Sequence, residues 1–86
     1  MDAWKLISNA NCELITLELK PNESIEKHIN PKDVIFYTLS GKGVLLIEEK
    51  EFNLSKGECI EVAKGLNRTW LNKGIESLIL LVIKSN

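Results

Sequence analysis

Short runs of apolar and β-branched residues alternate with turn residues along nearly the whole chain. These runs cover residues 14–19, 34–39, 44–47, 52–54, 59–62, 68–71 and 78–83. Glycine, proline, asparagine and serine separate them at spacings of about eight to twelve residues, as in small β-sandwiches and barrels. No stretch has both the length and the apolar spacing of an amphipathic helix. The pattern therefore predicts an all-β protein with antiparallel strands.

Two turns can be predicted in more detail. Proline suits the first central position of a type II turn, and asparagine tolerates the positive φ that the second position requires, so Pro21-Asn22 predicts such a turn. The runs at 44–47 and 52–54 flank the charged segment Glu-Glu-Lys-Glu at 48–51. That arrangement predicts a β-hairpin, although the Asn-Gly pair preferred in tight hairpins is absent.

Two groups of residues stand at fixed spacings around the predicted strands. The first is Asn22, His28, Asn30, Val34 and Gly41, and the second is Gly57, Ala63, Gly65, Arg68 and Asn72. These positions resemble the two motifs of the cupin superfamily, a glycine-anchored His-x-His-then-Glu segment and a Gly…Pro-x-Gly-x-x-His…Asn segment. The resemblance covers residues 13–84. It implies a double-stranded β-helix, the jelly-roll barrel of cupins, as a single domain over residues 1–86.

The resemblance also identifies the positions where metal-binding cupins carry their ligands, and most of those ligands are absent here. His28 and Asn30 stand at the two histidine positions of the first motif, Val34 at the glutamate position, and Arg68 at the histidine position of the second. Valine has no donor atom, and a guanidinium has no lone pair to offer a cation. His28 is the only strong ligand in this degenerate set, so we expect no metal site and no cofactor.

Strand alternation on the cupin pattern predicts that these positions share one cavity with further inward-facing residues. The set is Val34, Phe36 and Thr38 from one strand, His28 and Asn30 from a second, and Arg68 and Trp70 from a third. A guanidinium pairs with carboxylates or phosphates, often through two hydrogen bonds. An indole ring can stack on a sugar or another ring. We therefore interpret the chain as a binder of a small anionic or hydroxylated ligand.

Other interpretations of the same residues stay open from the sequence. Arg68 could reach the barrel mouth and pair with a glutamate such as Glu61, and His28 could bind the backbone or the nearby Glu26. Trp70 could serve core packing alone. The chain could then be a cupin enzyme of isomerase, epimerase or oxygenase type with a non-standard, metal-dependent site. It could also be a structural or regulatory homodimer whose cavity is filled by its own side chains.

Composition and charge narrow the function classes. The chain has 86 residues and a net charge of −1, with 44% hydrophobic and 27% charged residues, which is ordinary for one small globular domain. Without an excess of lysine and arginine, no nucleic-acid partner is expected. The start of the chain lacks a secretory pattern, and the longest apolar run is too short to cross a bilayer. We expect a cytoplasmic protein with no membrane partner, in which Cys12 and Cys59 are free thiols.

The outward faces of two predicted strands suggest self-association. Residues Ile35, Tyr37 and Leu39 make an apolar face opposite the inward one, and the run at 78–83 is apolar on both faces. A strand that is apolar on both faces needs a second covering layer, which a short chain can hardly supply. The sequence therefore predicts a homodimer that packs sheet against sheet.

Overall fold

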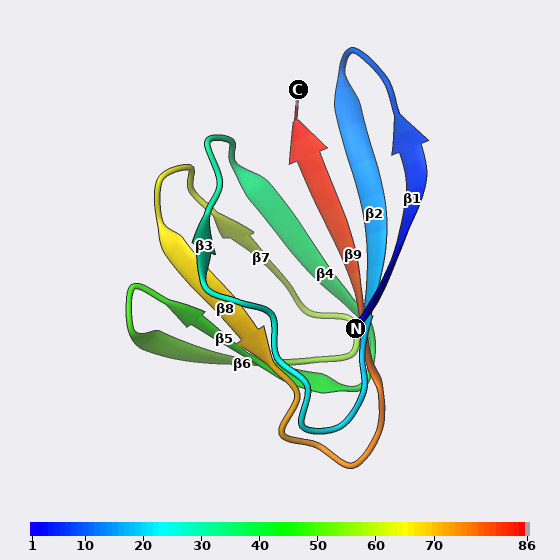
Figure 1. The fold of residues 1–86 in the computed structure, drawn as a ribbon, viewed down its shortest axis with the longest axis vertical. Coiled ribbons are helices and arrows are strands. Elements are labelled where there is room, and N and C mark those ends of the chain that lie inside the picture. The colour runs from blue at the N-terminus through cyan, green and yellow to red at the C-terminus, as the bar shows by residue number, and fades with distance from the viewer. Residues whose placement is uncertain (86) are drawn as a thin grey trace.

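The computed structural model describes residues 1–85, which form nine strands and no helix. The strands are β1 (Asp2–Ser8), β2 (Cys12–Leu19), β3 (His28–Ile29), β4 (Val34–Ser40), β5 (Lys42–Ile47), β6 (Lys50–Ser55), β7 (Cys59–Val62), β8 (Asn67–Leu71) and β9 (Leu78–Ser85). They build two sheets that lie against each other and spread apart toward one end (Figure 1). The all-β prediction is confirmed. Within the described chain there is no helix suited to spanning a bilayer.

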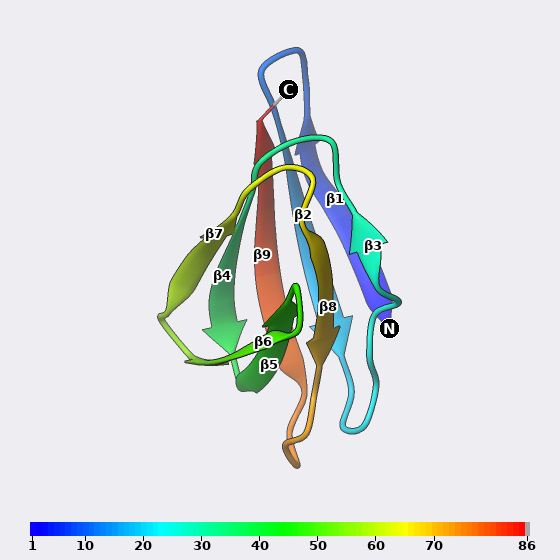
Figure 2. The ribbon, with the colours of Figure 1, turned by 90° about the vertical axis from the view of Figure 1, so that its left-hand side faces the viewer.

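The strand order is that of a double-stranded β-helix. One sheet has the order β1-β2-β9-β4-β7 and the other the order β3-β8-β5-β6, with every pair antiparallel. Consecutive strands pass repeatedly from one sheet to the other, so residues far apart in sequence meet between the two layers (Figure 2). This topology confirms the predicted jelly-roll barrel and brings β3, β4, β8 and β9 around one interior.

Strand alternation places the predicted residues inside the barrel. In β4, Val34, Phe36 and Thr38 are buried, whereas Tyr37 is exposed on the opposite face. The two sheets enclose a core of buried apolar side chains: Leu19, Val34, Phe36, Leu45, Leu54, Val62, Trp70, Leu78, Leu80 and Val82. The prediction that these three residues of β4 face the interior is therefore confirmed.

Both predicted turns form, the second with unusual residues. Asn22 has a φ of 70°, as the type II turn requires. Between β5 and β6, Glu48 and Glu49 have φ values of 47° and 73°, where glycine or asparagine is usual. A backbone hydrogen bond from the Glu48 N–H to the Asn67 carbonyl oxygen, 3.0 Å long, ties this hairpin to the adjacent segment. That tertiary contact helps to hold a conformation that the local sequence does not favour.

The hydrophobic pattern did not predict strand β1, in which all seven residues are exposed. It is an edge strand that pairs only with β2 and covers no core. The connecting turn is held by the Asn9 side chain, whose Oδ1 accepts hydrogen bonds from the Asn11 and Cys12 N–H groups at 2.8 and 3.0 Å. The strand widens the five-stranded sheet and adds Trp4 to its outer face.

Candidate functional site

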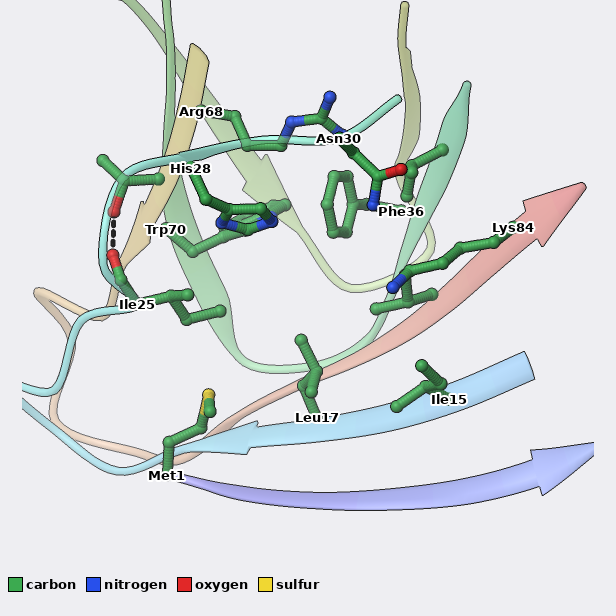
Figure 3. A pocket seen from close by; sticks show the side chains of 13 residues that line it. Met1, Ile15, Leu17, Ile25, His28, Asn30, Phe36, Arg68, Trp70 and Lys84 are labelled. Carbon is green, nitrogen blue, oxygen red and sulfur yellow. Dashed lines mark hydrogen bonds between the residues drawn. The ribbon is translucent and has the colours of Figure 1, made fainter. Parts of the chain in front are cut away.

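A cavity of about 200 Å³ lies between the two sheets, beside β3 and β8 on one side and β2, β4 and β9 on the other (Figure 3). Its walls are mainly apolar and include Ile15, Leu17, Ile25, Val34, Phe36 and Val82. Sites for drug-sized ligands have volumes of roughly 300–1,000 Å³, so this one suits a smaller molecule. Among the described residues, no aspartate or glutamate lines it.

Arg68 projects from β8 into this cavity and is only 1% exposed. Its Nε and Nη2 atoms each donate to the Leu66 carbonyl oxygen at 3.3 Å, and Nη2 also lies 3.5 Å from the Ala63 carbonyl oxygen. Its Nη1 atom is buried without a hydrogen-bond partner. The backbone carbonyls therefore fix the guanidinium and leave one nitrogen uncommitted.

No carboxylate neutralises this guanidinium within residues 1–85. The alternative in which Arg68 reaches the mouth and pairs with Glu61 is therefore wrong. Burial lowers the pKa of Arg68, because desolvation penalises the charged form. An arginine pKa lies so far above neutrality that the group stays charged. The cavity thus contains a fixed positive charge without a counter-ion.

His28 and Asn30 lie beside Arg68, as predicted. In the pairing of β3 with β8, His28 is opposite Arg68, and both His28 and Asn30 line the cavity. The His28 Nδ1 atom lies 3.2 Å from the Glu26 carbonyl oxygen, which can only accept, so Nδ1 carries the proton of this bond. His28 is exposed at the rim, with its ring oriented by the backbone.

The chain segment before β3 is held against β8 by two contacts. The Thr69 hydroxyl donates to the Ile25 carbonyl oxygen, drawn as the dashed line in Figure 3, and the Ile25 N–H donates to the Trp70 carbonyl oxygen at 3.0 Å. At the other end of β3, the Asn30 carbonyl oxygen accepts the Gly65 N–H at 2.9 Å. These bonds fix the wall that carries His28.

Phe36 and Trp70 belong to the core and also line the cavity. Both line the cavity, and their rings pack edge to face with centroids 5.5 Å apart. Trp70 fits because β5 has a glycine at position 43, where a Cβ would come within 2.7 Å of its Cζ3 atom. The Trp70 Nε1–H is buried without an acceptor. The indole is therefore part of the core and also an unused donor.

One predicted ligand-binding residue lies elsewhere. Thr38 is buried but does not line the cavity. Its backbone N–H donates to the Glu58 carbonyl oxygen at 2.9 Å, and its carbonyl oxygen accepts the Gly57 N–H at 2.8 Å. Thr38 lies where the loop between β6 and β7 packs against β4. The prediction failed because alternation fixes which face a residue occupies but not its depth along the barrel.

Lys84 lines the cavity but was not predicted. It continues the inward alternation of β9 after Leu78, Leu80 and Val82, and the predicted run ended one residue before it. Its side chain is 28% exposed, and its Nζ lies 4.0 Å from an oxygen of Glu13. Extending the two-residue period by one step, from Val82 to Lys84, would have found it.

The chain matches the family model of the cupin domain over residues 15–84. The protein is a member of the cupin family. This match confirms the resemblance seen in the two sequence motifs. No curated protein sequence matches the chain.

Several solved structures share this fold. The protein TT1209 from Thermus thermophilus superposes with a TM-score of 0.92 at 21% identity, over 99% of this chain and 82% of the other. An RmlC-like cupin family protein with a double-stranded β-helix fold, from Methanocaldococcus jannaschii, gives 0.91 at 20% identity, over 98% and 78%. A cupin superfamily protein from Desulfitobacterium hafniense gives 0.88 at 14% identity, over 96% and 74%. At these identities the likeness establishes the fold alone.

The residues of this cupin do not fit the metal that many cupins hold. Within the described chain, no three histidine, cysteine, aspartate or glutamate side chains come together. At the ligand positions the buried Arg68 cation would repel a metal ion, and Val34 has no donor atom. Asp33, beside Val34, instead accepts the Lys64 N–H at 2.8 Å. The chemistry of this cavity favours an anion over a cation.

Proposed function

We propose that this cupin binds a small anionic or hydroxylated organic molecule in its cavity, directly through protein side chains. The observation that carries the proposal is the buried Arg68 guanidinium, which has a free Nη1 atom and no carboxylate partner among residues 1–85. Removing a charge from water costs several kcal/mol, and a partner charge offsets that cost. An anion from solution would supply the missing partner.

The other polar groups support a ligand that also carries neutral oxygen atoms. The Trp70 Nε1–H is buried and can only donate, and the His28 ring is exposed beside the cavity. The Asn30 Oδ1 accepts the Lys32 N–H at 3.0 Å, which leaves its Nδ2 group as a donor. Apolar walls with a few oriented polar groups are typical of small-molecule sites. Arg68 would then supply most of the affinity, and the remaining groups would select among anions.

Thermal unfolding with a panel of small carboxylates, phosphates and sugar acids tests this proposal. A bound anion at about 100 times its Kd stabilises the folded state by about 2.7 kcal/mol, which raises the Tm by several degrees. Arg68→Met should abolish that shift, whereas Lys56→Met, which removes an exposed lysine outside this cavity, should preserve it. If no anion stabilises the wild-type protein, the proposal is wrong.

We also propose that the outer face of the five-stranded sheet binds a second copy of the chain. One register row crosses all five strands at Trp4, Thr16, Leu81, Tyr37 and Cys59. Around this row, Ile7 and Leu39 are also exposed apolar residues. Several exposed apolar side chains on one sheet face are unusual on a monomer, and a twofold axis would cover the same face on both copies.

Light scattering tests the dimer proposal. The wild-type protein should give a dimer mass, and Tyr37→Lys should give a monomer, because it places a charge at the centre of the proposed interface. Phe52→Lys is the matched control: Phe52 is 37% exposed, against 36% for Tyr37, but lies on β6 in the other sheet. A wild-type monomer at micromolar concentration, or equal effects of the two substitutions, would contradict the proposal.

A further inference from the structure

Lys84 brings a second cationic group to the cavity from the sheet opposite Arg68. Arg68 belongs to β8 in the four-stranded sheet and Lys84 to β9 in the five-stranded sheet. In Figure 3 the two side chains come from different walls of the cavity, and Phe36 and the Asn30 amide lie between their charged ends. The positive charge of the site is therefore divided between two walls of a mainly apolar cavity.

Neither cation has a carboxylate of its own within the described chain. Glu13 contacts Lys84 at 4.0 Å, but it lies closer to Lys5, at 3.2 Å, so one carboxylate serves two ammonium groups. Glu13 does not line the cavity, whereas Lys84 does. Arg68 has no acidic partner at all within residues 1–85. A single negative charge on a ligand would leave one end of the site short of a counter-ion.

The geometry of Arg68 also limits what it can hold. Its Nε and Nη2 atoms are engaged by the Leu66 and Ala63 carbonyls, so the side-on pair of nitrogens that usually grips a carboxylate is occupied. Only Nη1 is free. Arg68 therefore offers one nitrogen to one anionic group, and a second anionic group must find another partner.

We infer that the ligand class of this cavity is a short dicarboxylate with an apolar spacer. One carboxylate binds Arg68 Nη1, the other binds Lys84 Nζ, and the methylene groups between them pack against the apolar walls near Phe36 and Leu17. This inference rests on the proposed anion-binding function and deepens it. The cavity volume of about 200 Å³ limits the spacer to a few carbon atoms.

Isothermal titration of glutarate and of its monoamide tests the inference, because the two molecules differ by one negative charge at nearly equal size. For the wild-type protein, glutarate should bind about ten-fold more tightly, the gain expected from one charge-assisted hydrogen bond. Lys84→Met should remove that advantage and leave the two affinities equal. Arg68→Met should abolish binding of both compounds.

Lys5→Met is the matched control for Lys84→Met. Lys5 binds the same Glu13 carboxylate but does not line the cavity, so this variant should keep the preference for glutarate. Equal wild-type affinities for the two compounds would overturn the dicarboxylate inference and leave anion binding intact. If Lys5→Met removed the preference as fully as Lys84→Met, the dicarboxylate inference would also be overturned and anion binding would stay intact. Absence of any anion binding would instead overturn the proposed function.

Discussion

The two ends of the barrel interior are built by the same strands but contain different chemistry. At one end Leu19, Leu45 and Leu78 are fully buried and contribute only apolar contacts. At the other end the same inward alternation reaches Arg68 on β8 and Lys84 on β9 around an open cavity. The apolar end can stabilise the fold, which allows the cavity end to keep a buried charge that weakens it. Under the proposed function, stability and binding are thus separated along the barrel axis.

Leu78→Ala should have the largest effect and should act on stability alone. Leu78 is fully buried beside Gly43 and does not line the cavity. Truncation of a buried leucine costs about 2–5 kcal/mol, because it removes apolar contacts and leaves a void. Urea unfolding would measure this loss. Anion affinity, measured at a temperature where the variant is folded, should stay unchanged; a large loss of affinity would show that the two ends are coupled.

Arg68→Met should have a smaller effect in the opposite direction. Without any anion, this substitution removes an uncompensated buried charge and keeps a side chain of similar length, so the free energy of unfolding should rise by about 1 kcal/mol. The same variant should lose all stabilisation by anions. Urea unfolding with and without a bound carboxylate measures both effects. A clear loss of stability in the anion-free protein would indicate that Arg68 is a structural residue rather than a binding one.

Glu13→Gln should have the smallest effect, visible mainly in acid. The hydrogen bond from Lys5, aided by the charge of Lys84, holds the pKa of the Glu13 carboxyl below its ordinary value of 4.5. A carboxyl with a lowered pKa stabilises the fold above its unfolded pKa, and this contribution is lost as the pH falls through the folded pKa. The variant should therefore show a shallower decrease of Tm below pH 4.5.

Glu13→Gln should also change binding at the cavity end of the barrel. Glu13→Gln frees Lys84 from its shared carboxylate, so glutarate should bind about two-fold more tightly, in line with the small energies of exposed ion pairs. Glu61→Gln, which removes an exposed glutamate that forms no ion pair within the described chain, is the control for both readouts. Weaker binding by Glu13→Gln would contradict the role given to Lys84.

Strand periodicity predicted much of the site, and each residue that it misplaced or missed has a physical cause. Val34, Phe36 and Trp70 were predicted to face inward and do so, because a period of two residues fixes the face of each side chain. Thr38 was assigned to the same cavity but lies at a different depth. Lys84 was missed because the apolar run ends at Ile83, whereas β9 continues to Ser85 and its inward alternation reaches Lys84.

The sequence by itself determined the strands, their inward faces and the cupin frame, because these follow from local periodicity and from residues that permit turns. Whether an inward charge has a counter-ion was decided only by the tertiary structure. The loop directly before β8 supplies the Leu66 and Ala63 carbonyls that bind Arg68, whereas the fold as a whole brings no carboxylate to it within residues 1–85. Whether a charge is neutralised depends on atoms brought together from distant segments, and local sequence does not encode that distance.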